Sequence, residues 1–174
     1  MDKRIVTVFG SGGAKKREPL YQTALELGRA IAELDLTLCN GGYGGTMEAA
    51  ARGATEAGGH TIGVTCTRFR RAGPNPYIRQ EIPTFDLFQR LQTLIRLGRA
   101  YVVLPGGTGT LAELSLAWES RNKGRLRDDR PLIMLGDTWQ PVIDCVLLAQ
   151  PDAKAVHVVA DVSEARAILS ELAG

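Results

Sequence analysis

The 174-residue sequence has little sulfur or imidazole with which to build a metal site or a disulfide framework. Its three cysteines, Cys39, Cys66 and Cys145, form no C-x-x-C pair, and its two histidines have no partner at the spacing of zinc ligands. No resident metal or cofactor is therefore expected. An odd number of cysteines, two of them within apolar runs, is typical of buried free thiols in a reducing compartment.

Charge of one sign and long apolar runs are also missing. The 21 basic and 19 acidic residues leave a formal net charge of +2, which gives no reason to expect nucleic acid or a membrane surface as a partner. The first apolar run, residues 5–9, is too short for a signal peptide or a membrane span. A cytoplasmic location is therefore expected.

Short apolar runs alternate with segments of helical periodicity. The pattern predicts strands at residues 5–9, 36–39, 61–65, 101–104, 131–135 and 156–159, and helices at 19–34, 46–57, 85–97, 110–120, 139–148 and 163–172. Strands that are apolar throughout are buried on both faces, and intervening helices make right-handed parallel crossovers. We expect one Rossmann-like α/β domain over residues 1–174, with a doubly wound, mainly parallel sheet and helices on both faces. The proline-rich and arginine-rich segment 67–84 is expected to be a long loop.

The glycines gather in clusters directly after three of the predicted strands. In a doubly wound sheet these positions are the carboxyl ends of the strands, where ligands bind. Glycine there lets backbone N–H groups approach a phosphate at the start of a helix. The sequence therefore predicts a site for a phosphorylated small molecule, with candidate residues Gly10, Ser11, Gly42, Gly44, Gly45, Thr46, Gly106, Gly107, Thr108, Gly109 and Thr110.

The motifs of two common nucleotide-binding classes are absent. There is no G-x-x-x-x-G-K-[ST] loop, and the strand at 36–39 is followed by Asn40 instead of a carboxylate that could bind a ribose 2′-hydroxyl. An NAD-dependent dehydrogenase is therefore disfavoured. A phosphate or mononucleotide site stays open.

Two carboxylates and one arginine are candidates for chemistry at this site. Glu48 and Glu113 each follow a glycine loop and a threonine, and two carboxylates near a sugar phosphate suit glycosidic chemistry with its oxocarbenium-like transition state. Each also has a structural interpretation, because Thr110-x-x-Glu113 matches a capping box and Glu48 complements a helix dipole. Arg90 lies on the flank of an apolar helix stripe, where it could reach a site or remain solvated. The spacing leaves these alternatives open.

The nine residues PGGTGTLAE, from Pro105 to Glu113, match a P-G-G-x-G-T-x-x-E signature. With them, most of the chain resembles the LONELY GUY family of cytokinin riboside 5′-monophosphate phosphoribohydrolases, long labelled lysine decarboxylase-like. It is similar in particular to a short bacterial subgroup related to a molybdenum-cofactor carrier protein. The resemblance implies that Glu113 and Arg90 form the catalytic pair and that the protein is a homodimer. The family has a lysine after the arginine, where this sequence has Leu91.

Two functions follow from the residues and the resemblance together. The first is hydrolysis of the N-glycosidic bond of a nucleoside 5′-monophosphate, with the phosphate on the amides of residues 42–46 and 107–110 and Glu113 stabilising charge at C1′. The second is a carrier or sensor that binds a nucleotide or the molybdenum cofactor without turning it over. A dimer contact could come from an apolar stripe that could instead pack on the protein's own sheet: Leu87, Phe88, Leu111, Leu114 and Trp118.

Overall fold

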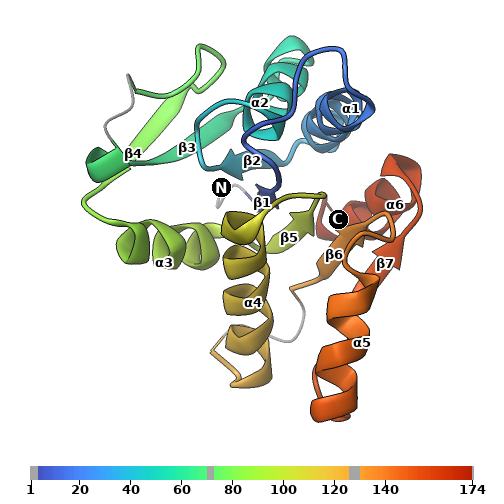
Figure 1. The fold of residues 1–174 in the computed structure, drawn as a ribbon. Helices are drawn as coiled ribbons and strands as arrows, with labels where there is room; N and C mark the ends of the chain where they lie inside the picture. The colour runs from blue at the N-terminus through green and yellow to red at the C-terminus, as the bar shows by residue number, and fades with distance from the viewer. Residues whose placement is uncertain (1–3, 70–72, 126–129, 174) are drawn as a thin grey trace.

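The computed structural model describes residues 4–69, 73–125 and 130–173. Over these residues strands and helices alternate along the chain (Figure 1). The elements are β1 (Ile5–Phe9), α1 (Pro19–Glu33), β2 (Thr37–Asn40), α2 (Thr46–Glu56), β3 (Thr61–Cys66), the 3₁₀ turn η1 (Thr67–Phe69), β4 (Gln80–Thr84), α3 (Leu87–Leu97), β5 (Ala100–Val103), α4 (Thr108–Asn122), β6 (Leu132–Leu135), α5 (Gln140–Ala149), β7 (His157–Val159) and α6 (Val162–Ala173).

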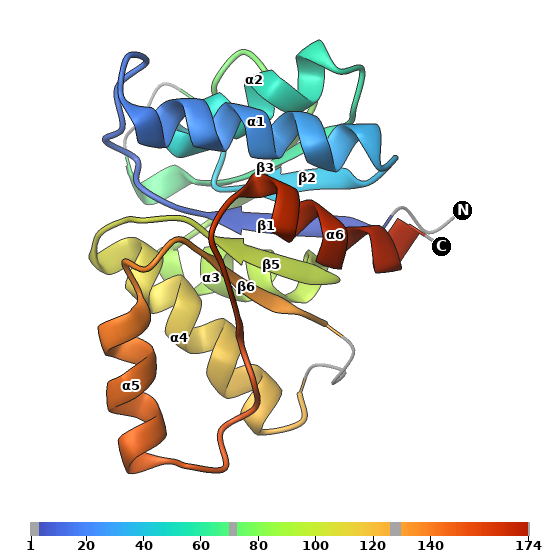
Figure 2. The same cartoon turned by 90° about the vertical axis from the view of Figure 1, so that its right-hand side faces the viewer.

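The described strands form one parallel sheet in the order β4-β3-β2-β1-β5-β6-β7. Helices cover both of its faces, so the predicted Rossmann-like, doubly wound fold is confirmed. Figure 2 shows α1 and α2 on one side of the sheet and α3 and α4 on the other. None of the described helices combines the length and the apolar character that a membrane span needs.

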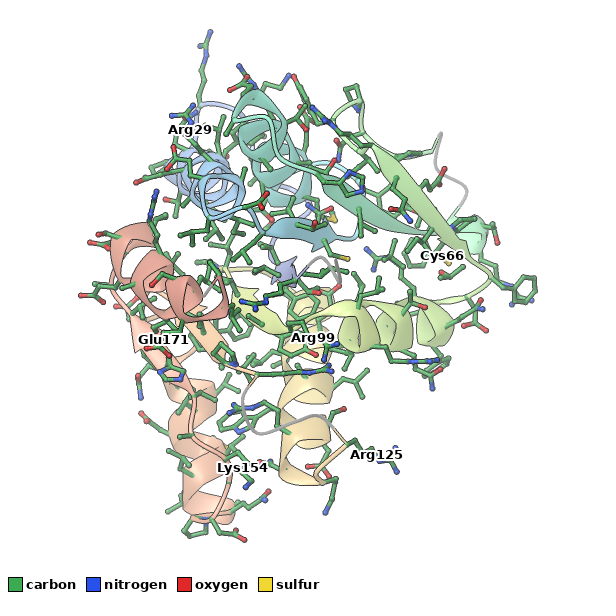
Figure 3. All side chains as sticks on the ribbon, turned by 180° about the vertical axis from the view of Figure 1, so that it is seen from behind. Arg29, Cys66, Arg99, Arg125, Lys154 and Glu171 are labelled. Atoms are coloured by element: carbon green, nitrogen blue, oxygen red, sulfur yellow. The ribbon has the colours of Figure 1, made fainter. Side chains whose placement is uncertain are left out.

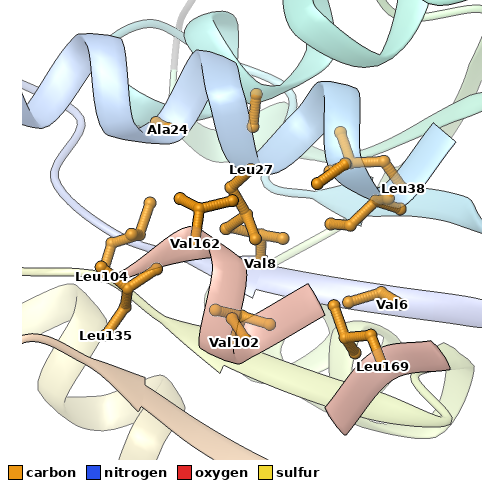
Figure 4. Close-up of a cluster of buried hydrophobic side chains, with 14 of the residues drawn as sticks. Val6, Val8, Ala24, Leu27, Leu38, Val102, Leu104, Leu135, Val162 and Leu169 are labelled. Atoms are coloured by element: carbon orange, nitrogen blue, oxygen red, sulfur yellow. The ribbon is translucent and has the colours of Figure 1, made fainter. Parts of the chain in front are cut away.

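Alternation of side chains along the strands divides the core into two layers. Val6 and Val8 of β1 belong to the cluster that packs on α1, α2 and α6, whereas Phe9 belongs to the cluster under α3, α4 and α5. Figure 4 shows Val8 below Leu27 of α1 in the first of these layers. Because both faces are buried, β1 and its neighbour β5 are held rigidly in the middle of the sheet.

The order of the strands creates a switch point between β1 and β5. From β1 the chain adds strands in one direction as far as β4, and then returns to place β5 on the opposite side of β1. The loops after β1 and β5 therefore leave the sheet in opposite directions, and a crevice opens between them. The glycine clusters at residues 10–13 and 106–109 lie in these two loops.

The structure corrects two predicted elements. Residues 80–84 form the edge strand β4 instead of the end of a loop, which the sequence hid because the segment QEIPT has no apolar run and contains Pro83. An edge strand tolerates proline, since only one of its sides must pair. Helix α4 begins at Thr108, two residues before the predicted start, with Gly107 as its N-cap.

The apolar stripe on α3 and α4 divides into two parts. Leu114 and Trp118 are buried in the protein's own core, as the alternative interpretation held, so they are not available for a dimer contact. Leu87, Phe88 and Leu111 are exposed, and Phe88 is the most exposed of the three at 77%.

Candidate functional site

A pocket of about 340 Å³ lies at the switch point, at the carboxyl edge of the sheet. Its wall comes from β1 and the glycine turn after it, the loop after β2, the first turn of α2, η1, α3 and the first turns of α4. Ligands bind at this place in doubly wound folds, so the predicted edge is the one that carries the pocket. The described residues contain no group of three or more His, Cys, Asp or Glu side chains that could hold a metal ion.

The N-terminus of α4 supplies a cradle for an anion. Gly107 and the three residues after it line the pocket together with Gly10 and Ser11. No side chain caps the helix, and the first intrahelical bond runs from the Leu111 N–H to the Gly107 carbonyl at 3.0 Å. The N–H groups of Thr108, Gly109 and Thr110 thus precede the helical ladder and are placed, with the helix dipole, to bind a phosphate.

The four candidate residues of the second glycine loop, Gly42, Gly44, Gly45 and Thr46, lie outside the pocket wall, although Gly41 and Tyr43 of the same loop line it. Thr46 donates to the Ser11 carbonyl oxygen from its backbone N–H at 2.9 Å and from its hydroxyl at 3.1 Å. A third bond, from the Ser11 N–H to the Pro105 carbonyl at 3.1 Å, ties the same turn to the loop after β5. The first glycine turn is therefore fixed between the other two loops.

Close packing of backbones explains two of the remaining glycines. Gly45 has φ 67°, and a Cβ on it would collide with the backbone of Ser11 and Gly12. Gly106 also lies outside the pocket wall, and a Cβ there would overlap the side chain of Thr110. Both glycines act by letting the loops approach one another.

Arg90 projects from α3 into the pocket and is held on several sides. Its side chain is buried, and Nε donates to the Val64 carbonyl at 2.8 Å. Its guanidinium carbon lies 5.7 Å from the ring centroids of both Tyr43 and Phe69, a cation–π arrangement. Gly41 leaves room for it, because a Cβ at that position would overlap Arg90 Nη2. The solvated alternative for Arg90 is therefore wrong.

Glu113 faces Arg90 from α4. Its Oε1 lies 3.6 Å from Arg90 Nη1, and both side chains are buried. The capping-box interpretation is wrong, because the N-cap is Gly107 and Glu113 is in the second turn of the helix. Burial raises the pKa of Glu113 from 4.5 to about 7, although the charge of Arg90 lowers it in part. Near neutral pH this carboxyl can therefore both hold and release a proton.

Glu48 does not join this pair. It is outside the pocket wall, where its Oε1 lies 3.4 Å from Lys16 Nζ and accepts a hydrogen bond from the Tyr21 hydroxyl at 3.3 Å. The expected arrangement of two carboxylates at one site is therefore not formed. Among the residues that the structure describes, the pocket wall has one carboxylate, Glu113, and one guanidinium, Arg90.

Three apolar side chains of the pocket wall were not expected from the sequence. Tyr43, Met47 and Phe69 line it, and none of them was a candidate. Tyr43 had a signal, since it is the one bulky residue inside the glycine run 41–45. Phe69 had none, because it lies in a segment that shows no regular periodicity.

Comparison with known proteins gives three findings. The model of the SLOG cluster4 family matches residues 3–165. A cytokinin riboside 5′-monophosphate phosphoribohydrolase of Mycobacterium tuberculosis is 34% identical over 130 residues, which are 69% of this chain and 64% of that protein. A pyrimidine/purine nucleotide 5′-monophosphate nucleosidase of Escherichia coli K12 is 31% identical over 146 residues, which are 76% of this chain and 31% of that protein.

A solved structure matches over nearly the whole length of both chains. The molybdenum cofactor carrier protein of Chlamydomonas reinhardtii superposes with a TM-score of 0.79 and 29% identity, over 98% of this chain and 98% of that one. By contrast, this chain spans about two thirds of the mycobacterial enzyme and one third of the Escherichia coli enzyme. The matched carrier protein is therefore about the size of this chain, whereas the two relatives named as enzymes are longer.

The raised pKa of Glu113 predicts how Glu113→Gln changes the pH dependence of stability. Between pH 4.5 and about 7 the folded protein keeps a proton that the unfolded chain releases. The stabilisation from this proton is complete below pH 4.5 and is lost as the pH rises to about 7, at up to about 1.4 kcal/mol per pH unit. The variant lacks this loss. The difference in free energy of unfolding, variant minus parent, should therefore increase as the pH rises from 5 to 7. Urea denaturation at several pH values measures this, and a constant difference would contradict the assignment.

Proposed function

The chain belongs to the SLOG cluster4 family, and we propose that it hydrolyses the N-glycosidic bond of a nucleoside 5′-monophosphate to give a free base and ribose 5-phosphate. One observation carries the proposal. A buried carboxyl with a pKa of about 7 lies 3.6 Å from a buried guanidinium, in the same pocket as the open amides of a helix N-terminus. The names of the mycobacterial and Escherichia coli relatives support the same reaction class.

In this proposal the phosphate is a handle and the reacting atom is C1′ of the ribose. The amides of residues 108–110 and the hydroxyls of Thr108 and Thr110 bind the 5′-phosphate. That placement directs the sugar toward Glu113, one helical turn further along α4. The ionised carboxylate stabilises the positive charge that develops at C1′ as the bond to the base stretches.

The protons and electrons balance without a metal or a cofactor. A water oxygen forms a bond to C1′, and the electron pair of the broken bond goes to the base nitrogen. Glu113 takes the proton that the water loses, and this proton then reaches the base. Arg90 orients the carboxylate and donates a hydrogen bond to the leaving base. Its charge keeps the pKa of Glu113 lower than burial alone would set it.

A second candidate function rests on the full-length match to the carrier protein. In this case the same cradle binds a phosphorylated ligand, such as a nucleotide or the molybdenum cofactor, and releases it unchanged. The two functions differ in whether a base is released. Under either one we propose a cytoplasmic location, where the three free cysteines would stay reduced.

The test of the proposed function is incubation with AMP, GMP, CMP and UMP, followed by chromatography for free base and ribose 5-phosphate. The parent protein should release base from at least one of them. Glu113→Gln keeps an acceptor for Arg90 but removes the charge, so turnover should fall about 100-fold or more while the protein stays folded. If the parent binds a nucleotide tightly but releases no base, the hydrolase proposal is wrong and the carrier function is supported.

Gly107→Val tests the phosphate cradle. A Cβ on Gly107 meets no atom within 4 Å, and its φ is −95°, so the variant should fold. The added methyl groups take space in the cradle, so affinity for ribose 5-phosphate should fall at least about tenfold, as expected when charge-assisted hydrogen bonds are lost. Gly44→Ala is the matched control, because Gly44 lies outside the pocket and its Cβ would meet its nearest atom at 3.8 Å. Equal affinities in the parent and both variants would refute the cradle.

We also propose that the protein is a homodimer whose contact includes the exposed apolar residues of α3 and α4. Phe88 is 77% exposed and lies beside Leu87 on α3, and Leu111 is exposed on α4, a helix that contacts α3. Light scattering of the parent should therefore give twice the mass of the chain, and the Phe88→Glu variant should have the mass of a monomer. Leu148→Glu on α5, where Leu148 is 87% exposed, is the control and should remain dimeric. A parent protein that is monomeric at micromolar concentration would refute the dimer.

A further inference from the structure

The pocket changes character from one end to the other. The wall at α4 presents backbone amides and hydroxyls, Glu113 pairs with Arg90, and the guanidinium carbon of Arg90 lies 5.7 Å from the ring centroids of Tyr43 and Phe69. A ligand that places its phosphate at α4 and its sugar at Glu113 directs its third part toward these apolar side chains. What they can recognise decides which ligands the site accepts.

Tyr43 is a fixed wall and not a free donor. Its hydroxyl accepts a hydrogen bond from the Cys66 N–H at 2.8 Å and donates to the Cys66 carbonyl at 3.2 Å. Cys66 is the last residue of β3, close to α3 (Figure 3), and η1 follows it directly. The tyrosine thus ties the loop after β2 to the start of η1, and so fixes the place of Phe69.

Phe69 is the ring that a ligand can reach. It is 37% exposed, whereas Tyr43 is 6% exposed. The two rings are tilted by 42° with centroids 6.1 Å apart, and Arg90 lies at 5.7 Å from each of them. An exposed ring face backed by a second ring and a buried cation is a surface on which a flat heteroaromatic group can stack.

Side chains that could read the edge of a base are scarce at this end. Among the described side chains of the wall, Ser11, Thr108 and Thr110 belong to the phosphate end and Glu113 faces the sugar. The Tyr43 hydroxyl is already bonded twice to Cys66, so Arg90 is the one polar group of these side chains beside the rings. Apart from the contact with Arg90, binding of the base then depends on stacking, and stacking accepts every base because every base has a π face.

We propose that the base of the nucleotide stacks on Phe69, and that this contact makes the site accept purine and pyrimidine nucleoside monophosphates alike. This inference rests on the proposed function for the orientation of the ligand. It makes Phe69 a residue that sets substrate class, while the phosphate cradle and the Arg90–Glu113 pair stay common to all substrates.

The test compares binding of AMP, UMP and ribose 5-phosphate by calorimetry, because ribose 5-phosphate lacks the base. The parent should bind both nucleotides more tightly than ribose 5-phosphate. Phe69→Ala should lower the affinity for AMP about tenfold or more, and the affinity for UMP by a smaller factor, since the purine covers more of the ring. The affinity for ribose 5-phosphate should stay unchanged. Phe69→Trp should restore or exceed the parent's affinity for both nucleotides.

Phe85→Ala is the matched control. Phe85 is 60% exposed and lies under the guanidinium of Arg68 at 4.5 Å, but it does not line the pocket. This variant should bind all three ligands as the parent does. Unchanged nucleotide affinity in Phe69→Ala, or an equal loss for ribose 5-phosphate, would overturn the stacking proposal.

The two proposals fail on different measurements. Because the stacking test measures binding alone, a parent that binds nucleotides through Phe69 without releasing base would refute the hydrolase and support the stacking. A parent that releases base but binds ribose 5-phosphate as tightly as AMP would refute the stacking and support the hydrolase.

Discussion

The burial of Arg90 is the constraint around which the site is arranged. A buried guanidinium without partners would be very costly, so each neighbouring element supplies part of its surroundings. The carbonyl of Val64 accepts from Nε, Glu113 supplies the opposite charge, and two aromatic rings lie beside the guanidinium. Gly41 has no side chain because Nη2 occupies that space. One side chain thus connects the loop after β2 with β3, η1, α3 and α4.

A second constraint is the close approach of the loops at the switch point. The carbonyl oxygen of Ser11 accepts two bonds from Thr46, and its N–H donates to Pro105, so the first glycine turn cannot move independently of its neighbours. The amides at the start of α4 line the pocket beside this fixed turn. The glycine loops therefore hold one another in place as well as forming part of the pocket wall.

The sequence predicted the sheet, its switch point and the edge that carries the pocket, because buried strands and glycine clusters leave strong local patterns. It predicted Arg90 and Glu113 together only through the resemblance to a family, since their approach depends on how α3 and α4 pack. It did not separate Thr46, which bonds to Ser11, from Thr110, which lines the pocket. The edge strand β4 and the position of the Phe69 ring were not predicted. An edge strand needs no apolar run, and an irregular segment has no hydrophobic periodicity.

The environment of Glu113 bears on the choice between carrier and hydrolase. Keeping this carboxyl buried disfavours its charged form and raises its pKa to about 7. Its structural role is the ion pair with Arg90, since the N-cap of α4 is Gly107 and the start of the helix does not depend on Glu113. The carrier proposal needs a phosphate cradle at α4 and a stacking surface at Phe69, and neither of these requires a carboxyl that titrates near neutral pH. An oxocarbenium-like transition state, by contrast, places positive charge beside a desolvated carboxylate, where the attraction is strong because water is excluded. In the proposed hydrolysis the carboxylate would be stabilised most when the bond to the base is breaking, and this difference between ground state and transition state is the reason to prefer the hydrolase proposal.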